Sequence, residues 1–335
     1  MIDISNKLEG KVVSITGASG YIGSALTQEL EKYPVKKIIR TSRKELVSKD
    51  GVEDWVLDLN KKSSWIKIVN KSDIIFHLSG NTSIYNAEKN PKESLISNLL
   101  PVIQLINISK KLSRIPRVVF SSTATVYGLT EVLPVLESRQ PNPITIYDLH
   151  KFFAEQQLLL ASNSNIIDAI SLRLANVYGP SPTESLANDR GILSKITKMR
   201  FELKNLQIYG NGEYLRDYIY IDDVVNAFLH VSVMNYDILL ARNDITLNVA
   251  SGKGTSVKEV FSLISNEVEK ITGIRGAIKN VAWPKGVNEI EKRNYIASIE
   301  LIKSLTGLKP SVSLEEGIQL LVKHYSKECI SNEVS

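Results

Sequence analysis

The stretch that decides the fold is KVVSITGASGYIGSAL, residues 11–26 of the 335-residue chain. Three of its first six residues are apolar and four are β-branched, which predicts a buried strand. Residues 24–33 follow as a predicted helix. Three glycines, Gly17, Gly20 and Gly23, therefore fall at a strand-to-helix turn.

This turn predicts a dinucleotide-binding site. Without a Cβ atom, Gly17 and Gly20 let the backbone approach a pyrophosphate, and Gly23 lets the helix pack closely on the strand. The free N–H groups of the helix N-terminus favour the anion. Spaced glycines also occur in ordinary turns, so the prediction depends on their place at the first strand-to-helix turn. The other residues of the turn that we expect to contact the cofactor are Ser19, Tyr21 and Ile22.

Short apolar runs alternate with longer helical stretches on both sides of this turn. We expect strands at residues 11–16, 36–41, 54–57, 73–78 and 117–122. Strands that alternate with helices pair in parallel, because each connection must cross the sheet. The sequence therefore predicts an α/β protein with a Rossmann-like, doubly wound parallel sheet.

The second half alternates less regularly and predicts a smaller lobe. At roughly 150 residues per domain, the length predicts about two domains. Residues 257–271 have helical periodicity, with Ser256 as the expected N-cap and Gly273 as the stop. We expect a dinucleotide-binding domain over 1–176 with returns near 221–250, a mixed α/β substrate-binding lobe from 177–220 and 251–330, and a tail over 331–335.

The composition excludes several classes of protein. The 41 Lys and Arg residues exceed the Asp and Glu residues by five, which is too dilute for a charge-driven nucleic-acid binder. No apolar run approaches the roughly 18 residues of a membrane span, and residues 1–11 are polar, unlike a signal peptide. One cysteine, Cys329, and four scattered histidines argue against a metal site. We expect a cytoplasmic homodimer with no nucleic-acid or membrane partner.

The end of the second predicted strand distinguishes NAD from NADP. An NAD site usually has an acidic residue there for the ribose 2′-hydroxyl, whereas NADP needs a cation and small hydrogen-bond donors. Here Thr41, Ser42 and Arg43 stand at that position and no carboxylate does. A solvent-exposed strand end with no ligand could have the same residues. The two hydroxyls and the arginine nevertheless favour NADP(H) as the cofactor, and NAD(H) is possible. Further cofactor contacts are expected at Asp58, Leu59, Leu78, Gly80 and Ser121.

A catalytic pair is expected where a tyrosine precedes a lysine by four residues. On one helical face the cation lowers the phenol pKa, so the pair can give or take a proton at a carbinol. This spacing occurs at Tyr33 with Lys37, Tyr85 with Lys89, and Tyr147 with Lys151. Tyr33 precedes Pro34 at the far end of the first helix, and Tyr85 is expected in a loop before Asn90.

Only the third pair has the context of an active site. Tyr147 opens a long predicted helix that also carries Lys151, and the preceding strand ends in Ser121, Ser122 and Thr123. A hydroxyl and the phenol can therefore meet at the carboxyl ends of the strands, where open α/β sheets bind their ligands.

Five motifs together resemble the extended short-chain dehydrogenase/reductase family of nucleotide-sugar enzymes. They are GxxGxxG at 17–23, SSTATVYG at 121–128, YxxxK at 147–151, RLANVYGP at 173–180 and RDYIYIDDV at 216–224. The resemblance covers nearly the whole chain in order. It implies a nucleotide-sugar substrate and an NAD(P) cofactor.

The resemblance also assigns roles to individual residues. It implies that Thr123, Tyr147 and Lys151 are catalytic, and that Tyr147 and Lys151 also contact the cofactor. The substrate-binding residues that it implies are Thr123, Asn176, Arg216 and Arg293. Alternatively, Arg216 could form an internal salt bridge with Asp217 or Asp222, and Asn176 could cap a turn.

Sequence differences between the enzyme classes of this family indicate which reaction the protein catalyses. Dehydratases have Asp-Glu directly after the catalytic threonine, where this chain has Ala124 and Thr125. Residues 147–155, 188–193 and 306–310 are similar to NADPH-dependent 4-ketoreductases of TDP-4-keto-6-deoxyhexoses. We therefore expect NADPH-dependent reduction of a nucleotide-linked 4-keto(-6-deoxy)hexose at C4. The SSTATVYG motif resembles UDP-hexose 4-epimerases, so 4-epimerisation is the alternative, and a non-catalytic NADP-binding protein is a third candidate.

Overall fold

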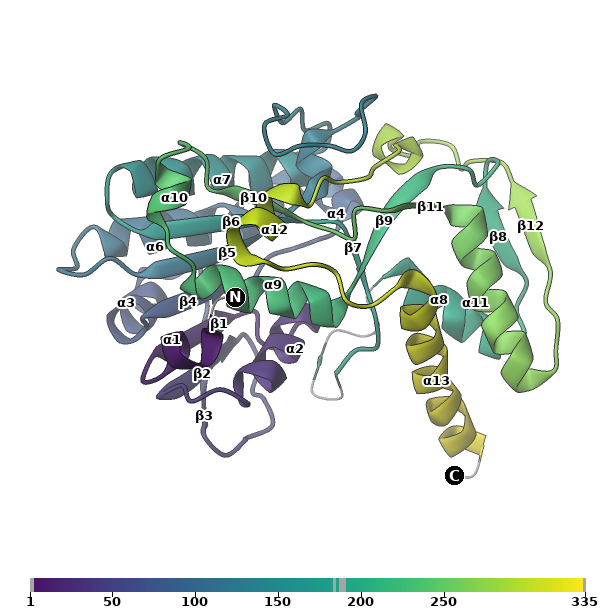
Figure 1. Cartoon of the computed structure of the whole chain (residues 1–335), viewed down its shortest axis with the longest axis horizontal. Helices are drawn as coiled ribbons and strands as arrows, with labels where there is room; N and C mark the ends of the chain where they lie inside the picture. The colour runs from purple at the N-terminus through teal and green to yellow at the C-terminus, as the bar shows by residue number, and fades with distance from the viewer. Residues whose placement is uncertain (1–2, 183–184, 187–190, 334–335) are drawn as a thin grey trace.

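A computed structural model describes residues 3–182, 185–186 and 191–333 (Figure 1). Its centre is a sheet of seven parallel strands in the order β10-β6-β5-β4-β1-β2-β3. These strands are β1 (Val12–Thr16), β2 (Lys37–Ser42), β3 (Val52–Val56), β4 (Ile74–His77), β5 (Arg117–Thr123), β6 (Asp168–Leu174) and β10 (Thr246–Val249). The strand order reverses between β1 and β4, and ligands of open α/β sheets bind at such a point.

Helices cover both faces of this sheet. One layer contains α3 (Lys62–Lys71), α6 (Leu100–Ser109) and α7 (Ile146–Asn163), with α4 (Ile84–Lys89) and α5 (Pro91–Asn98) packed beside α7. The other contains α1 (Ile4–Leu8), α2 (Tyr21–Leu30) and α9 (Ile221–Val233), and α10 (Asp237–Leu240) follows α9. None of the helices in the described residues is long and apolar enough to span a membrane. The predicted doubly wound fold class is confirmed.

A smaller lobe lies at the right of Figure 1. It has a three-stranded sheet of β7 (Asn176–Tyr178), β9 (Leu215–Tyr220) and β11 (Gly254–Ser256), and a parallel pair of β8 (Leu206–Tyr209) and β12 (Ile278–Val281). Helices α8 (Ile192–Phe201), α11 (Val257–Thr272) and α13 (Leu314–Glu333) pack together in this lobe. The 3₁₀ turns η1 (Ala124–Tyr127) and η2 (Glu289–Lys292) and helix α12 (Glu300–Thr306) complete the described elements.

The structure corrects two local predictions. Tyr85 and Lys89 lie in helix α4 and not in a loop. Ser83 starts this helix by accepting the N–H of Asn86 at 3.2 Å, a capping bond that stabilises even a short helix. Helix α13 continues to Glu333, so the segment expected as a tail from residue 331 is helical up to that point.

Candidate active site

A cavity of about 810 Å³ opens at the carboxyl ends of β1, β2, β4 and β5. The residues that we predicted to contact the cofactor line it, apart from Tyr147 and Lys151. They are Gly17, Ser19, Gly20, Tyr21, Ile22, Gly23, Thr41, Ser42, Arg43, Asp58, Leu59, Leu78, Gly80 and Ser121. The sequence therefore located the residues of one cleft from five separate segments of the chain.

The glycine turn fits a dinucleotide. Gly17 has φ +73°, and a Cβ atom there would lie 2.9 Å from the backbone of Ser79. A Cβ atom at Gly23 would lie 2.3 Å from the carbonyl oxygen of Gly17. A side chain at either position would collide with the backbone, so both positions require glycine. The backbone can then approach a ligand closely, and the first turn of α2 can present its N–H groups to the cleft.

The end of β2 presents hydroxyl groups and one cation to this cleft. Ser42 donates to the Ser19 hydroxyl at 3.2 Å, and Arg43 is exposed beside them. The hydroxyl oxygen of Thr41 is buried and has no hydrogen-bond partner among the described residues. Arg40 faces elsewhere, because its Nε donates to Asp54 at 2.7 Å. Ser19, Ser42 and Arg43 are thus the groups at this rim that fit an additional phosphate.

Helix α7 holds both members of the Tyr147 and Lys151 pair. Thr145 caps the helix by accepting the N–H of Asp148 at 3.1 Å, which places Tyr147 in the first turn and Lys151 one turn later. The Lys151 ammonium lies 4.2 Å from the centre of the Phe120 ring. It also lies 4.0 Å from the position that a Cβ atom would take on Gly80, so it borders the cofactor cleft.

The electrostatics of this pair differ from the prediction. Burial lowers the pKa of Lys151 to about 7. Burial, with a further contribution from the adjacent Asp148, raises the pKa of Tyr147 above its ordinary value. The Tyr147 pKa is therefore raised and not lowered as expected, because desolvation dominates it and Lys151 does not contribute to the shift.

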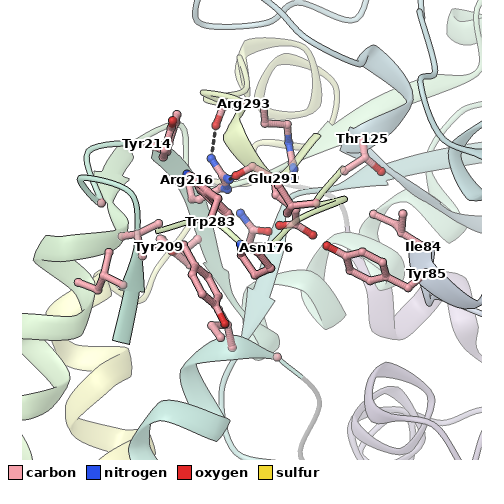
Figure 2. A pocket seen from close by; sticks show the side chains of 18 of the residues that line it. Ile84, Tyr85, Thr125, Asn176, Tyr209, Tyr214, Arg216, Trp283, Glu291 and Arg293 are labelled. Carbon is pink, nitrogen blue, oxygen red and sulfur yellow. Dashed lines mark hydrogen bonds between the residues drawn. The ribbon is translucent and has the colours of Figure 1, made fainter. Parts of the chain in front are cut away.

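A second cavity, of about 850 Å³, lies between the sheet domain and the smaller lobe (Figure 2). Thr123 and Tyr147 line it from the sheet domain. Asn176, Arg216 and Arg293, the three other predicted substrate contacts, also line it. Thr82 and Gly191 line both this cavity and the cofactor cleft, so the two spaces adjoin.

Arg216 is positioned by carbonyl groups and not by a carboxylate. Its guanidinium donates to the carbonyl oxygen of Glu291 at 2.5 Å and to that of Arg293, a contact drawn as a dashed line in Figure 2. Asp217 instead accepts the N–H groups of Ser251 and Gly252, so the alternative of an Arg216–Asp217 salt bridge is wrong. Through these two hydrogen bonds Arg216 holds the η2 segment in place, and Arg293 stays beside the cavity.

Several residues of this cavity were not predicted from the sequence. Tyr209, Tyr214 and Trp283 form an aromatic cluster at one end, in which the Tyr209 and Trp283 rings stack with centroids 5.4 Å apart. In Figure 2 the Glu291 carboxylate and Tyr85 lie toward the opposite end. The tyrosine-lysine spacing had identified Tyr85, but its short helix went unrecognised. Residues 188–190 of the ketoreductase-like motif lie outside the described residues.

The sequence also matches known proteins. Residues 13–238 match the model of the NAD dependent epimerase/dehydratase family. The chain belongs to this family. The predicted recognition of the family, and of an enzyme, is confirmed. No group of residues that could hold a metal ion is found in the described part of the chain.

Three relatives indicate the range of similarity. The UDP-glucose 4-epimerase of Mycoplasma genitalium is 27% identical, over 75% of this chain and 79% of its own. The crystal structure of the UDP-glucose 4-epimerase of Thermotoga maritima with UDP-glucose has a TM-score of 0.79 and 27% identity, and the match covers 95% of this chain and 99% of that one. MoeE5 in complex with UDP-glucuronic acid and NAD has a TM-score of 0.80 and 25% identity, with 95% and 100% covered.

Proposed function

We propose that the protein interconverts the C4 epimers of a nucleotide-linked hexose. One observation carries the proposal: Thr123 and Tyr147 line the same cavity as Arg216 and Arg293, next to the dinucleotide cleft. Two arginines suit a diphosphate, because guanidinium groups bind phosphate oxygens with charge-assisted hydrogen bonds. The two 4-epimerases among the relatives above support C4 as the reacting carbon.

The chain's own residues supply the proton chemistry of this reaction. A nicotinamide held in the adjoining cleft would supply the acceptor and donor of the C4 hydride. Tyr147 takes the proton of the C4 hydroxyl and returns it to the C4 oxygen after the sugar has turned its other face to the cofactor, and Thr123 hydrogen-bonds the C4 oxygen. Lys151 in its charged form stabilises the phenolate of Tyr147. Arg216 and Arg293 hold the diphosphate while the sugar turns between the two half-reactions.

We also propose that the cofactor is NADP(H). Ser19, Ser42 and Arg43 support this choice, because they offer two hydroxyls and a cation at the end of β2, where an NAD site usually has a carboxylate. MoeE5, by contrast, is described with NAD. The variant Arg43→Asp tests the choice. Its NADPH affinity should fall by tens of fold, about 2 kcal/mol, because an attraction becomes a repulsion. Its NADH affinity should stay within about twofold, and equal losses for both cofactors would refute the assignment.

The ketoreductase predicted from the sequence remains a second candidate. The NADP-compatible end of β2 favours it, because a reductase consumes NADPH and must exchange it. An epimerase leaves its cofactor unchanged, so the two reactions differ in redox stoichiometry.

One experiment separates the two reactions. The purified enzyme is mixed with UDP-glucose and a catalytic trace of cofactor, and separately with stoichiometric NADPH and a TDP-4-keto-6-deoxyhexose. The proposal expects UDP-glucose and UDP-galactose to interconvert without net change in nicotinamide absorbance. Stoichiometric loss of NADPH with the keto sugar, and no interconversion, would replace the epimerase with the reductase.

The protein is further proposed to form a homodimer. Leu95 on α5 and Phe153 and Leu160 on α7 are exposed apolar side chains on two helices that pack together. Such a face suits a partner of its own kind. Sedimentation velocity should give twice the monomer mass, and Phe153→Glu with Leu160→Glu should shift it toward the monomer.

A further inference from the structure

The substrate cavity contains a carboxylate that has no partner in the described part of the protein. Of the described residues that line this cavity, Arg216, Arg293 and Glu291 carry a charge at neutral pH. The Arg216 guanidinium donates to main-chain carbonyl groups, and that of Arg293 donates to the carbonyl oxygen of Ile290 at 2.7 Å. The Glu291 carboxylate forms no hydrogen bond or ion pair with any described residue. It can therefore interact with a ligand.

The main chain fixes Glu291 in the wall of this cavity. Asn288 caps the η2 turn by accepting the N–H of Ile290 at 3.0 Å, and the N–H of Glu291 donates to the carbonyl oxygen of Asn288 at 3.0 Å. Arg216 donates to the carbonyl oxygen of Glu291 at 2.5 Å. Because both backbone groups of Glu291 are bonded, its side chain starts from a fixed point and only its rotamer can change.

The Glu291 carboxylate lies at the end of the cavity where the sugar would bind. The Thr125 hydroxyl is 2.7 Å from that of Thr123, so Thr125 marks the place proposed for the chemistry at C4. In Figure 2 the Glu291 carboxylate lies toward Thr125 and Tyr85 and away from Trp283. Burial raises the pKa of Tyr85, and the charge of Glu291 raises it further, which agrees with the closeness of the two side chains.

The charges of the cavity match a nucleotide-linked sugar that has no charge of its own. The diphosphate of such a substrate carries two negative charges, which Arg216 and Arg293 offset. A hexuronic acid adds a third negative charge at C6. Because C6 is attached to C5, next to the reacting C4, this charge would lie at the sugar end, where the described lining offers Glu291 and no further cation. Like charges in a partly desolvated site repel each other, whereas the hydroxyls of a neutral hexose can donate to a carboxylate.

We propose that Glu291 is a specificity-determining residue that favours nucleotide-linked neutral hexoses and excludes nucleotide-linked hexuronic acids. This proposal rests on the epimerase function proposed above, because that function places the sugar beside Thr123 and Tyr147. Glu291 accepts a hydrogen bond from a hydroxyl of the neutral sugar and repels a carboxylate at C6. Selectivity between two similar ligands often needs such a repulsive group in addition to attractive contacts. The proton transfer at the C4 oxygen does not involve Glu291.

Ligand affinities test this proposal without turnover. Titration calorimetry with saturating reduced cofactor, which cannot accept a hydride from the sugar, compares UDP-glucose, UDP-glucuronic acid and the uncharged uronamide of UDP-glucuronic acid. The wild-type protein should bind UDP-glucuronic acid at least about tenfold more weakly than both other ligands, because the acid alone carries the third charge. Equal affinities for UDP-glucose and UDP-glucuronic acid would overturn the proposal. So would a uronamide that binds as weakly as the acid, because size and not charge would then set the preference.

The variant Glu291→Gln removes the charge and keeps the size of the side chain. The preference for UDP-glucose over UDP-glucuronic acid should fall about tenfold, through a gain in affinity for the acid. Glu291 could instead serve only to offset the charge of the two arginines. In that case UDP, UDP-glucose and UDP-glucuronic acid would all gain affinity equally, and the unchanged preference would overturn the proposal. A preference that falls only because UDP-glucose binds more weakly would also overturn it.

The variant Glu289→Gln is the matched control. Glu289 belongs to the same η2 turn, lines neither cavity and pairs with Lys292 at 2.7 Å. Its neutralisation changes the net charge equally and should leave the preference within about twofold, because an exposed charge is screened. A fall as large as that of Glu291→Gln would overturn the proposal, since the position of Glu291 would then not matter. If the wild-type enzyme interconverts no C4 epimers, the proposed function fails, whereas the measured affinities still decide the role of Glu291.

Discussion

Lys151 is a buried cation whose proton is loosely held. Its pKa of about 7 arises from burial above the Phe120 ring, and the attraction of Glu155 offsets only part of the desolvation. Tyr147 beside it holds its proton more tightly than a free phenol. The pair therefore needs an additional favourable charge or hydrogen bond before a phenolate forms at neutral pH. A cofactor that contacts Lys151, as we propose, would supply it.

This state of Lys151 predicts proton uptake when the cofactor binds. Slightly above its pKa, at about pH 8, most Lys151 side chains in the free protein are neutral. A dinucleotide brings anionic phosphates and ribose hydroxyls, which favour the ammonium form, so binding should take up close to one proton. Calorimetry in two buffers of different ionisation enthalpy measures this number. Lys151→Met should show no such uptake, and equal uptake in both proteins would contradict the assignment.

The proton-transfer role proposed for Tyr147 gives a second prediction at this scale. Tyr147→Phe removes the hydroxyl and keeps the ring, so turnover should fall by roughly 10² or more while cofactor affinity stays near normal. Tyr33→Phe is the matched control, because Tyr33 has the same spacing to a lysine but lies beyond the end of α2. Tyr85 is unsuitable as a control, since it lines the substrate cavity. A comparable loss in Tyr33→Phe would place the active site elsewhere.

At the scale of elements, local signals predicted some boundaries and missed others. Strand β1 lies within one residue of its predicted bounds, 11–16, because it is buried in the middle of the sheet between β2 and β4. Helix α11 begins after Ser256 and stops before Gly273, which adopts a left-handed conformation, as its caps predict. Helix α4 was missed, because six mostly polar residues have no apolar periodicity and only Ser83 marks the start.

The cap of α11 predicts a measurable stability change. The Ser256 hydroxyl accepts the N–H of Glu259 at 3.2 Å, so Ser256→Ala should lower the free energy of unfolding by about 1 kcal/mol. Ser262→Ala is the control within the same helix, because its hydroxyl only donates to the carbonyl of Lys258, and it should be nearly neutral. Denaturant titration of both variants checks the difference, and equal midpoints would show that the cap contributes nothing.

At the scale of the whole molecule, the sequence predicted mainly the residues of regular elements, and Arg293, which directly follows η2, was predicted only through the family resemblance. The glycine turn, the tyrosine-lysine pair and Asn176 belong to regular elements whose register fixes where they lie. Glu291 and Trp283 come from irregular or very short segments between β12 and α12. Arg216 holds part of that region through carbonyl groups, and backbone carbonyls leave no signature in a sequence. The aromatic end of the substrate cavity was therefore unpredictable from residue types alone.

The arrangement of two adjoining cavities predicts how a hydride label behaves. The cofactor cleft lies mainly at the sheet domain, whereas Arg216 and Arg293, which we propose as the ligands of the substrate diphosphate, line the adjoining cavity. A 4-keto sugar formed between them remains tethered by its diphosphate, so the hydride should return to the molecule that gave it. A mixture of C4-deuterated UDP-glucose and ¹³C-labelled, non-deuterated UDP-glucose tests this by mass spectrometry.

The epimerised products should carry deuterium or ¹³C but rarely both, because one cofactor serves one sugar through both half-reactions. Arg216→Met weakens the tether and should raise the doubly labelled fraction, since a released keto sugar can be replaced by another. Arg242→Met removes an exposed arginine outside both cavities and should not. If the wild-type enzyme gives doubly labelled product at the statistical share, the keto sugar leaves between the half-reactions. The two arginines would then bind the substrate without retaining the intermediate, and return of the hydride would not depend on the junction of the two cavities.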